Sequence, residues 1–298
     1  MNIDKNKFTF DLQRFDSAFS GGDGSQDNPY QIASAADLQT LAAYVNAGNN
    51  CSGLTFKLTQ DIDLSGVTDW TPIGTTTSKD LAFQGTFDGD GFALKNLTVD
   101  TNTKFVGLFG YIYEGTVKNL TLENFSVTNQ LNSYWATTGA LTGYAEAATI
   151  ENVTVIGATV KGSEGYVGGL VGTAEDGSTV KNCCTQAQAS GGYRNGAIVG
   201  DNYGSNTFEN NLYASNAAAQ GRGNNINASK LVTLGKTADF NGVTISGDYY
   251  TLGDSYGAGV GTNLTFTVPS NSYIENAEKT NDNTYTYTAA ENSLPKFW

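Results

Sequence analysis

Histidine is absent from this chain of 298 residues. Its absence excludes a Ser-His-Asp triad, an HExxH zinc site and any reaction that needs an imidazole as general base. Cysteine is scarce as well, because Cys51, Cys183 and Cys184 make an odd number that does not match a disulfide framework. An adjacent pair of cysteines without histidine cannot complete a usual zinc site. We therefore expect no cofactor, and the cysteines leave the redox compartment open.

Charged residues are also few, at 15% of the chain, and 29 acidic residues outnumber 16 basic ones. The net charge of −13 disfavours nucleic acid and anionic membranes as partners, since both are bound through basic patches. No run of 18 apolar residues occurs, so the sequence predicts no membrane-spanning helix. The N-terminal stretch MNIDKNKFTFDLQRFD lacks the apolar core of a secretory signal, which leaves the export route open.

The chain is rich in small and polar residues, and glycine alone contributes 36 of them. Together with the scarcity of helix-forming residues, this composition favours strands and turns. A glycine element recurs four times, as VGLFG at 106–110, TGALTG at 138–143, VGGLVG at 167–172 and NGAIVG at 195–200. An asparagine follows each element after nine or ten residues, and successive asparagines are 33, 30 and 28 residues apart. Such a period is typical of a solenoid.

These asparagines lie at a break in the strand pattern. An apolar and then a charged residue precede each of them, and an apolar residue follows most of them. Since strand side chains alternate, two successive inward residues require a bend, which asparagine tolerates in the left-handed conformation. We expect the side chains to point inward and to stack into a hydrogen-bonded ladder inside a parallel β-helix. The predicted ladder consists of Asn96, Asn119, Asn152, Asn182 and Asn210.

The glycine elements admit functional interpretations that the surrounding sequence excludes. A Walker loop needs a lysine after its last glycine, and a membrane GxxxG motif needs a long apolar segment. A dinucleotide fingerprint needs a βαβ context, which the sequence lacks. We interpret the elements as corners of a β coil, where a Cβ atom would clash with neighbouring backbone. The elements supply a predicted inward column of Leu108, Leu141, Leu170 and Ile198.

The stretch VGGLVG, followed by STVKNC at 178–183, resembles the GLUG repeat of bacterial surface and secreted proteins. Upstream, DNPYQIASAADLQTLAAYVNAG, FKLTQDIDLSG and FQGTFDGDGFALKNLTV resemble the cap and first coils of such proteins. The resemblance covers about residues 27–215 and implies a right-handed parallel β-helix, often in adhesin-like proteins at cell surfaces. Some members carry a metallopeptidase domain, which the absence of histidine excludes here.

The patterning divides the chain into three predicted parts. Residues 1–20 form an N-terminal tail or sorting segment, in which FTFDLQRF at 8–15 is either an added strand or a sorting tag. Residues 21–222 form the capped β-helix. Residues 223–298 alternate apolar and polar residues between turn signals, which predicts a small antiparallel β module or a C-terminal cap.

A short helix is predicted at the N-terminal end of the solenoid. Ser34 and Asp37 have the spacing of a capping box, and Gly48 suits the C-terminal stop. We expect this helix to cover the first coil, whose open edge would otherwise invite aggregation. Its predicted apolar stripe contains Leu38, Leu41, Ala42 and Val45.

Two pairs of carboxylates are weak candidates for catalysis or calcium binding. Asp61 and Asp63 share one face of a strand, and Asp88 and Asp90 are equally close. Enzymes that cleave polysaccharides use clustered carboxylates, sometimes with Ca²⁺. Asp-Gly is also an ordinary turn signal, and both segments match the cap pattern, so we favour a structural role without a metal.

The cysteine pair and the aromatic loops complete the candidates. Cys183 falls in an apolar column and is predicted to be a small buried hydrophobe. Cys184 falls in a predicted outward threonine column, where it is either an inert surface thiol or a reactive one. Aromatic residues near each glycine element are predicted to stack into one lateral ridge or to pack between coils. The ridge candidates are Phe105, Tyr134, Trp135, Tyr166, Tyr193 and Arg194.

No set of catalytic residues emerges, so we expect a non-enzymatic protein with an adhesive or structural role. The resemblance implies an extracellular or cell-surface location, and a glycan or a protein on a host or neighbouring cell is the expected partner. The alternative is a polysaccharide-active enzyme or carbohydrate-binding module of the pectate-lyase-like superfold that uses surface carboxylates. Incubation with a glycan panel distinguishes the two, since an enzyme cleaves what a binder only retains.

Overall fold

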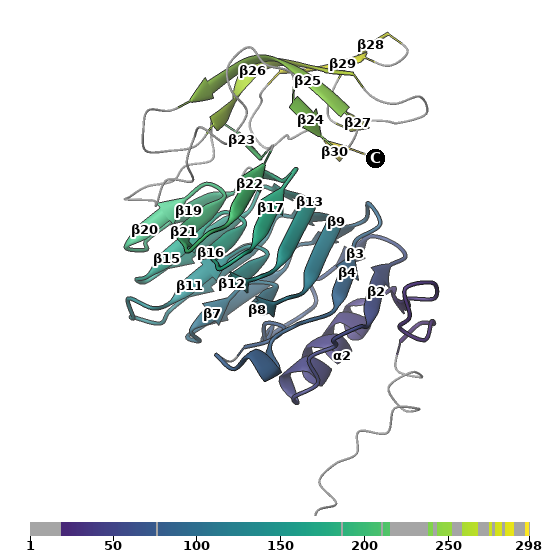
Figure 1. Ribbon diagram of the computed structural model, residues 1–298, viewed down its shortest axis with the longest axis vertical. Helices are drawn as coiled ribbons and strands as arrows, with labels where there is room; N and C mark the ends of the chain where they lie inside the picture. The colour runs from purple at the N-terminus through teal and green to yellow at the C-terminus, as the bar shows by residue number, and fades with distance from the viewer. Residues whose placement is uncertain are drawn as a thin grey trace, which may run out of the picture.

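The computed structural model describes residues 19–75, 77–185, 187–209 and 211–214, and the backbone of strands between residues 238 and 297. The chain winds into a parallel β-solenoid whose coils stack one on another above an N-terminal helix (Figure 1). This architecture confirms the predicted all-β parallel β-helix with a short capping helix. The FTFDLQRF segment and Asn210 lie outside the described residues.

Four stacks of strands form the faces of the solenoid. The long sheet contains β1 (Tyr30–Ile32), β2 (Thr55–Leu58), β3 (Ile62–Asp63), β4 (Thr86–Asp88), β5 (Ala93–Lys95), β9 (Thr116–Glu123), β13 (Thr149–Ile156), β17 (Thr179–Lys181), β18 (Cys184–Thr185), β22 (Thr207–Glu209) and β23 (Leu212–Ala214). The second sheet contains β6 (Thr98–Thr101), β10 (Ser126–Asn129), β14 (Thr159–Gly162) and β19 (Gln188–Ser190).

Two further sheets flank the glycine elements. The third sheet contains β7 (Phe105–Val106), β11 (Thr137–Gly139), β15 (Tyr166–Gly168) and β20 (Arg194–Gly196). The fourth sheet contains β8 (Phe109–Tyr113), β12 (Thr142–Glu146), β16 (Val171–Glu175) and β21 (Val199–Tyr203). One coil therefore leaves the long sheet at β9, passes through β10, β11 and β12, and returns to the long sheet at β13.

Inward side chains fall into columns because neighbouring coils pair in register. Val117, Ile150, Val180 and Phe208 lie opposite one another along β9, β13, β17 and β22, and all four are buried. The glycine elements contribute a second buried column, which confirms the sequence prediction: Leu108, Leu141, Leu170 and Ile198. Each such side chain stabilises the fold by about 1.5–3 kcal/mol through burial.

Glycines between the third and fourth sheets bring two backbones into direct contact. A Cβ atom at Gly143 would lie 2.4 Å from the Val106 amide nitrogen, and one at Gly172 would lie 2.4 Å from the Thr138 amide nitrogen. Backbone atoms cannot move aside as the end of a side chain can, so only glycine fits at these two positions. The predicted coil corners are confirmed.

The four described asparagines of the predicted ladder occupy left-handed bends, with φ values of 60°, 53°, 57° and 54° for Asn96, Asn119, Asn152 and Asn182. Asn152 Nδ2 donates to Asn119 Oδ1 at 2.9 Å, and Asn119 Nδ2 donates to Asp88 Oδ1 at 3.0 Å. The predicted inward orientation is wrong, since these side chains are only half-buried. The residue after each bend is buried, the charged residue before it stays half-buried, and the asparagine itself lies at the corner.

Asn96 does not continue this column. Strand β5 pairs with the C-terminal half of β9, which places Asn96 beside Asn124 rather than Asn119. Asn96 Nδ2 donates to Asp63 Oδ1 at 3.0 Å, and its Oδ1 accepts from Asn124 Nδ2 at 3.4 Å. The spacing of 23 residues from Asn96 to Asn119 is shorter than one coil. The prediction of a single ladder is therefore wrong, and these residues belong to two columns.

Helix α2 (Ala35–Asn46) lies at the N-terminal end of the solenoid, beside β2 (Figure 1). Half of the predicted capping box is present, since Ser34 Oγ accepts from the Asp37 amide at 3.2 Å, while Asp37 Oδ2 accepts at 2.9 Å from the amide of Ala33, one residue before the N-cap. The predicted apolar stripe of Leu38, Leu41, Ala42 and Val45 is buried. A short 3₁₀ helix, η1 (Lys79–Leu81), follows later in the chain. Among the described residues, neither helix has the length and apolar character that a bilayer crossing requires.

The C-terminal part adds antiparallel strands to the end of the long sheet (Figure 1). Strand β26 pairs in parallel with β23, and in antiparallel fashion with β25 and β29. This pairing is the small β element that the alternating sequence predicts, while its predicted start at residue 223 lies outside the described residues. The added strands are β24 (Ala238–Phe240), β25 (Val243–Thr251), β26 (Ala258–Thr267), β28 (Glu278–Asn281) and β29 (Thr284–Thr288). Strands β27 (Ile274–Glu275) and β30 (Lys296–Phe297) pair with each other in a separate antiparallel sheet.

We expect Gly172→Ala to lower the free energy of unfolding by about 1–3 kcal/mol, because the added methyl group displaces strand backbone. Urea unfolding followed by far-UV circular dichroism measures this loss. Gly66→Ala is the matched control, since a Cβ atom there meets nothing within 4 Å, and its effect should stay within about 0.5 kcal/mol. A Gly172→Ala variant as stable as the wild type would contradict the backbone contact at the corner.

Asn152→Leu should cost about 1–3 kcal/mol of stability, because Asn119 Oδ1 then loses its donor at a half-buried corner. Thermal unfolding of the variant against the wild type measures the effect. Asn102→Leu provides the control, since Asn102 is exposed and lies outside both columns. Identical melting temperatures for the Asn152 and Asn102 variants would show that the ladder contributes nothing to stability.

Candidate functional site

The predicted aromatic ridge is two separate clusters. Phe105 is 3% exposed and stacks on Tyr144, with ring centroids 4.7 Å apart and planes 12° from parallel. Tyr111 completes this first cluster edge-on to both rings, at 5.5 Å from Phe105 and 5.1 Å from Tyr144. The prediction of Phe105 as an exposed binding residue is therefore wrong. It packs across the glycine corner, where the third and fourth sheets come close.

The second cluster is exposed, and we call Tyr134, Trp135 and Tyr193 the aromatic patch. Their side chains are 37%, 65% and 45% exposed, respectively. Tyr134 lies at the centre, with ring centroids 5.3 Å from Trp135 and 5.0 Å from Tyr193. Tyr166 is buried beneath the patch and contacts Tyr134 edge-on at 5.4 Å. The patch thus joins the loop before β11 to the loop before β20.

Arg194 contacts Tyr193 of the aromatic patch and the buried Tyr166 beneath it. Its guanidinium lies 5.6 Å from the Tyr166 ring centroid and 5.8 Å from that of Tyr193. Arg194 Nη1 also donates to Asp201 Oδ1 at 2.6 Å, and Asp201 is buried. Burial, together with a hydrogen bond to Tyr134, raises the pKa of Tyr166, which therefore stays neutral. Arg194 thus contacts two tyrosines and one buried carboxylate, and its binding role stays a prediction.

The loop that carries Tyr134 and Trp135 is anchored by a buried asparagine. Asn129 Nδ2 donates to the Thr138 hydroxyl and to the Thr103 carbonyl, both at 3.1 Å. Asn129 Oδ1 accepts from the Leu131 amide at 3.0 Å, which starts the turn. Because both ends of the asparagine side chain are engaged, the loop leaves the solenoid in a fixed direction and presents Trp135 to solvent.

The four aspartates considered for metal binding or catalysis do not meet at one point. Asp61 forms an ion pair with Lys95 at 2.7 Å, and Asp63 accepts from Asn96 Nδ2. The other two also have lysine partners: Asp88 pairs with Lys118 at 3.2 Å and Asp90 with Lys57 at 2.9 Å. Within the described ranges, no three acidic, cysteine or histidine side chains gather as a metal site would require. The geometry gives the four residues structural roles at turns and between coils.

Both cysteines of the adjacent pair are buried, so the predicted surface position of Cys184 is wrong. Cys184 lies in register with Thr154, which pairs in turn with Thr121, and the whole column is buried. Burial raises the pKa of the Cys183 and Cys184 thiols to about 12, so both stay protonated at neutral pH. Neither cysteine has the thiolate character that reactivity needs.

A further set of residues escaped the sequence prediction. Tyr113, Glu146, Glu175 and Tyr203 lie opposite one another on four successive strands of the fourth sheet, and we call them the Tyr–Glu column. Each of them is the third residue after the last glycine of its element. That fixed distance was the available signal, and it was missed because the residue type changes from tyrosine to glutamate and back.

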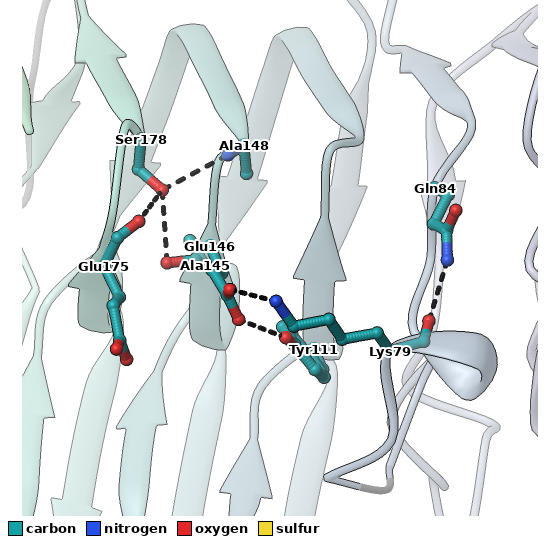
Figure 2. Close-up of polar contacts among 8 residues, drawn as sticks. All are labelled: Lys79, Gln84, Tyr111, Ala145, Glu146, Ala148, Glu175 and Ser178. Carbon is teal, nitrogen blue, oxygen red and sulfur yellow. Dashed lines mark hydrogen bonds and ion pairs between the residues drawn. The ribbon is translucent and has the colours of Figure 1, made fainter.

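Two side chains from other strands or helices bind the Glu146 carboxylate directly. Lys79 Nζ, from η1, lies 2.5 Å from Glu146 Oε1, and the Tyr111 hydroxyl donates to Glu146 Oε2 at 2.5 Å (Figure 2). The same ammonium lies 4.4 Å from the Tyr113 ring centroid. Burial and the bond to Glu146 raise the pKa of Tyr111, so it acts as a neutral donor.

The GLUG motif model matches residues 163–183 of this chain. Over 164 residues, or 52% of the chain, the sequence is 40% identical to halomucin from Haloquadratum walsbyi, of which the match covers 2%. Over 199 residues, or 64% of the chain, it is 36% identical to a protein from Evansella cellulosilytica provisionally named a Gly-rich membrane protein, of which the match covers 22%. The chain thus spans a small part of either relative.

A solved protein from Bacteroides ovatus, provisionally identified as an immunoglobulin A1 protease, superposes with a TM-score of 0.49 and 21% sequence identity. The superposition covers 72% of this chain and 76% of that one. The motif match falls on β15, β16 and β17, where the glycine corner and the left-handed bend at Asn182 are found. Motif and coil geometry agree, and the chain is a parallel β-solenoid protein that contains a GLUG motif.

Proposed function

We propose that this chain is a non-enzymatic surface or secreted solenoid that adheres to a glycan or a neighbouring surface through its aromatic patch. The single observation that carries the proposal is the exposure of Tyr134, Trp135 and Tyr193 together, at 37%, 65% and 45%. They are three of the four large hydrophobic side chains that are exposed in the described part of the chain. Clustered exposed aromatics are enriched where a protein meets a ligand.

The patch is held ready for binding before a ligand arrives. Tyr134 contacts both other rings, Tyr166 supports it from below, and Arg194 is fixed by Asp201. Rings that are already ordered lose little conformational entropy on binding, so more of the contact energy remains as affinity. A patch built from two loops offers room for one or two sugar rings or a short segment of protein, rather than for a polymer lying along the whole solenoid.

The names of the relatives support a location outside the cytoplasm. One is named halomucin, and the other is provisionally named a membrane protein. The alternative of a polysaccharide-active enzyme receives less support, because the aspartates considered for it are engaged by lysine or asparagine side chains. Incubation with neutral and acidic glycans separates the two functions, since retention without cleavage supports a binder and cleavage supports an enzyme.

Trp135→Ala should weaken retention on the bound glycan or cell surface by about tenfold, because it removes the largest exposed ring of the patch. The melting temperature should stay within about 1 °C of the wild type, since a side chain that is 65% exposed contributes little to the core. Quantitative adhesion of the purified chain, together with thermal unfolding, measures both effects.

Asn132→Ala is the matched control, because Asn132 is exposed in the same loop but carries no ring. Trp135→Phe should recover part of the binding, since it restores an aromatic face. Unchanged adhesion for Trp135→Ala alongside a lowered melting temperature would mean that the patch only packs on the solenoid, and the proposal would then be wrong.

A further inference from the structure

The Tyr–Glu column contains the same pair of residues twice, in opposite order. Tyr113 lies opposite Glu146, and Tyr203 lies opposite Glu175, while the two glutamates lie opposite each other at the centre. The column is therefore symmetric about its middle. This arrangement sits on the outer face of the fourth sheet and shares no residue with the aromatic patch.

The first pair already holds an ammonium group. Lys79 comes from η1, 67 residues before Glu146 in the chain, and its Nζ binds the Glu146 carboxylate at 2.5 Å. The same nitrogen lies over the Tyr113 ring, 4.4 Å from its centroid. A carboxylate and an aromatic face together attract a cation through its charge and through the ring quadrupole. Glu146 and Tyr113 thus form an ammonium site within the protein, and Lys79 occupies it.

The second pair has the same two groups without a cation. Within the described part of the chain, the Glu175 carboxylate has no hydrogen bond or ion pair, and it lies one coil beyond Glu146 (Figure 2). Tyr203 is 66% exposed, so its ring can be approached from solvent. Burial, and then the charge of Asp176, raise the pKa of Glu175, and the charges of Lys79 and Lys104 offset this only in part, as expected for a carboxylate that has lost hydration without a direct ion pair.

We propose that Glu175 and Tyr203 bind the ε-ammonium of a lysine side chain from a partner polypeptide, as Glu146 and Tyr113 bind Lys79. The internal occupant is itself a lysine that arrives from a separate segment, which favours this source of the ammonium. The chain's net charge of −13 steers basic partners toward it. The inference goes beyond the proposed adhesion through the aromatic patch and does not depend on it.

The test uses the full chain labelled with ¹⁵N and titrated with Nα-acetyl-lysinamide at millimolar concentration. We expect saturable amide shifts in β16 and β21, and none when the probe is acetylated at Nε, because acetylation removes the charge. Glu175→Gln should weaken binding about fivefold, and Tyr203→Ala about threefold. Glu209→Gln, a change of equal charge at an exposed position of β22, should leave the affinity unchanged.

Vacating the first pair gives an independent arm of the test. Lys79→Met removes the resident ammonium, so the probe should then shift amides around Glu146 as well as around Glu175. The proposal would be overturned if Glu175→Gln left the affinity for the probe unchanged, or if Glu209→Gln lowered that affinity by the same factor. Saturable shifts with glucosamine but not with the lysine probe would overturn the choice of lysine as the source.

Discussion

The contact of backbone with backbone at the glycine corners is the constraint on which the rest of this structure depends. At Gly143 and Gly172 the neighbouring strand lies so close that a Cβ atom would stand 2.4 Å from a backbone nitrogen. Because these contacts repeat at the same place in successive coils, they fix how one coil is set against the next. A slip of one residue would send every inward side chain of the coil outward. The corners therefore define the register that all columns share.

Because the coils pair in register, residues at the same position of successive repeats lie next to one another. This holds both for side chains inside the solenoid and for those on its surface. Inside, Leu108 and its equivalents form a continuous apolar column. At the bends, Asn152 donates a hydrogen bond to Asn119. On the outer surface, Lys181 forms an ion pair with Glu151 of the adjacent coil, at 3.0 Å. The Tyr–Glu column arises in the same way. A function carried by such a surface needs no catalytic geometry, since the scaffold already places like positions about 4.8 Å apart.

The sequence was sufficient to predict the parallel β-helix, the corners, the inward leucines and the capping helix, because each depends on local chemistry and a constant period. Errors occur where packing between coils decides the outcome. Asn96 was aligned with Asn119 because both follow similar residues, but β5 pairs further along β9. Phe105 was expected outside, yet Tyr144 stacks on it across the corner. Cys184 was expected at the surface because its threonine column was expected to face outward, but Thr121 and Thr154 are buried as well. A one-dimensional pattern contains neither the irregular first coils nor the contacts across a corner.

The most direct measurement of the register is cross-linking between adjacent coils. Thr128 and Lys161 lie opposite each other on β10 and β14, so a Thr128→Cys/Lys161→Cys variant should form a disulfide on mild oxidation. The native cysteines in the described part of the chain are buried and do not compete. Thr128→Cys/Ser163→Cys, shifted by two residues, places the Cα atoms about 8 Å apart and should stay reduced. Efficient cross-linking of the shifted pair with none in the aligned pair would contradict the register, and with it the account of the columns and sites given above.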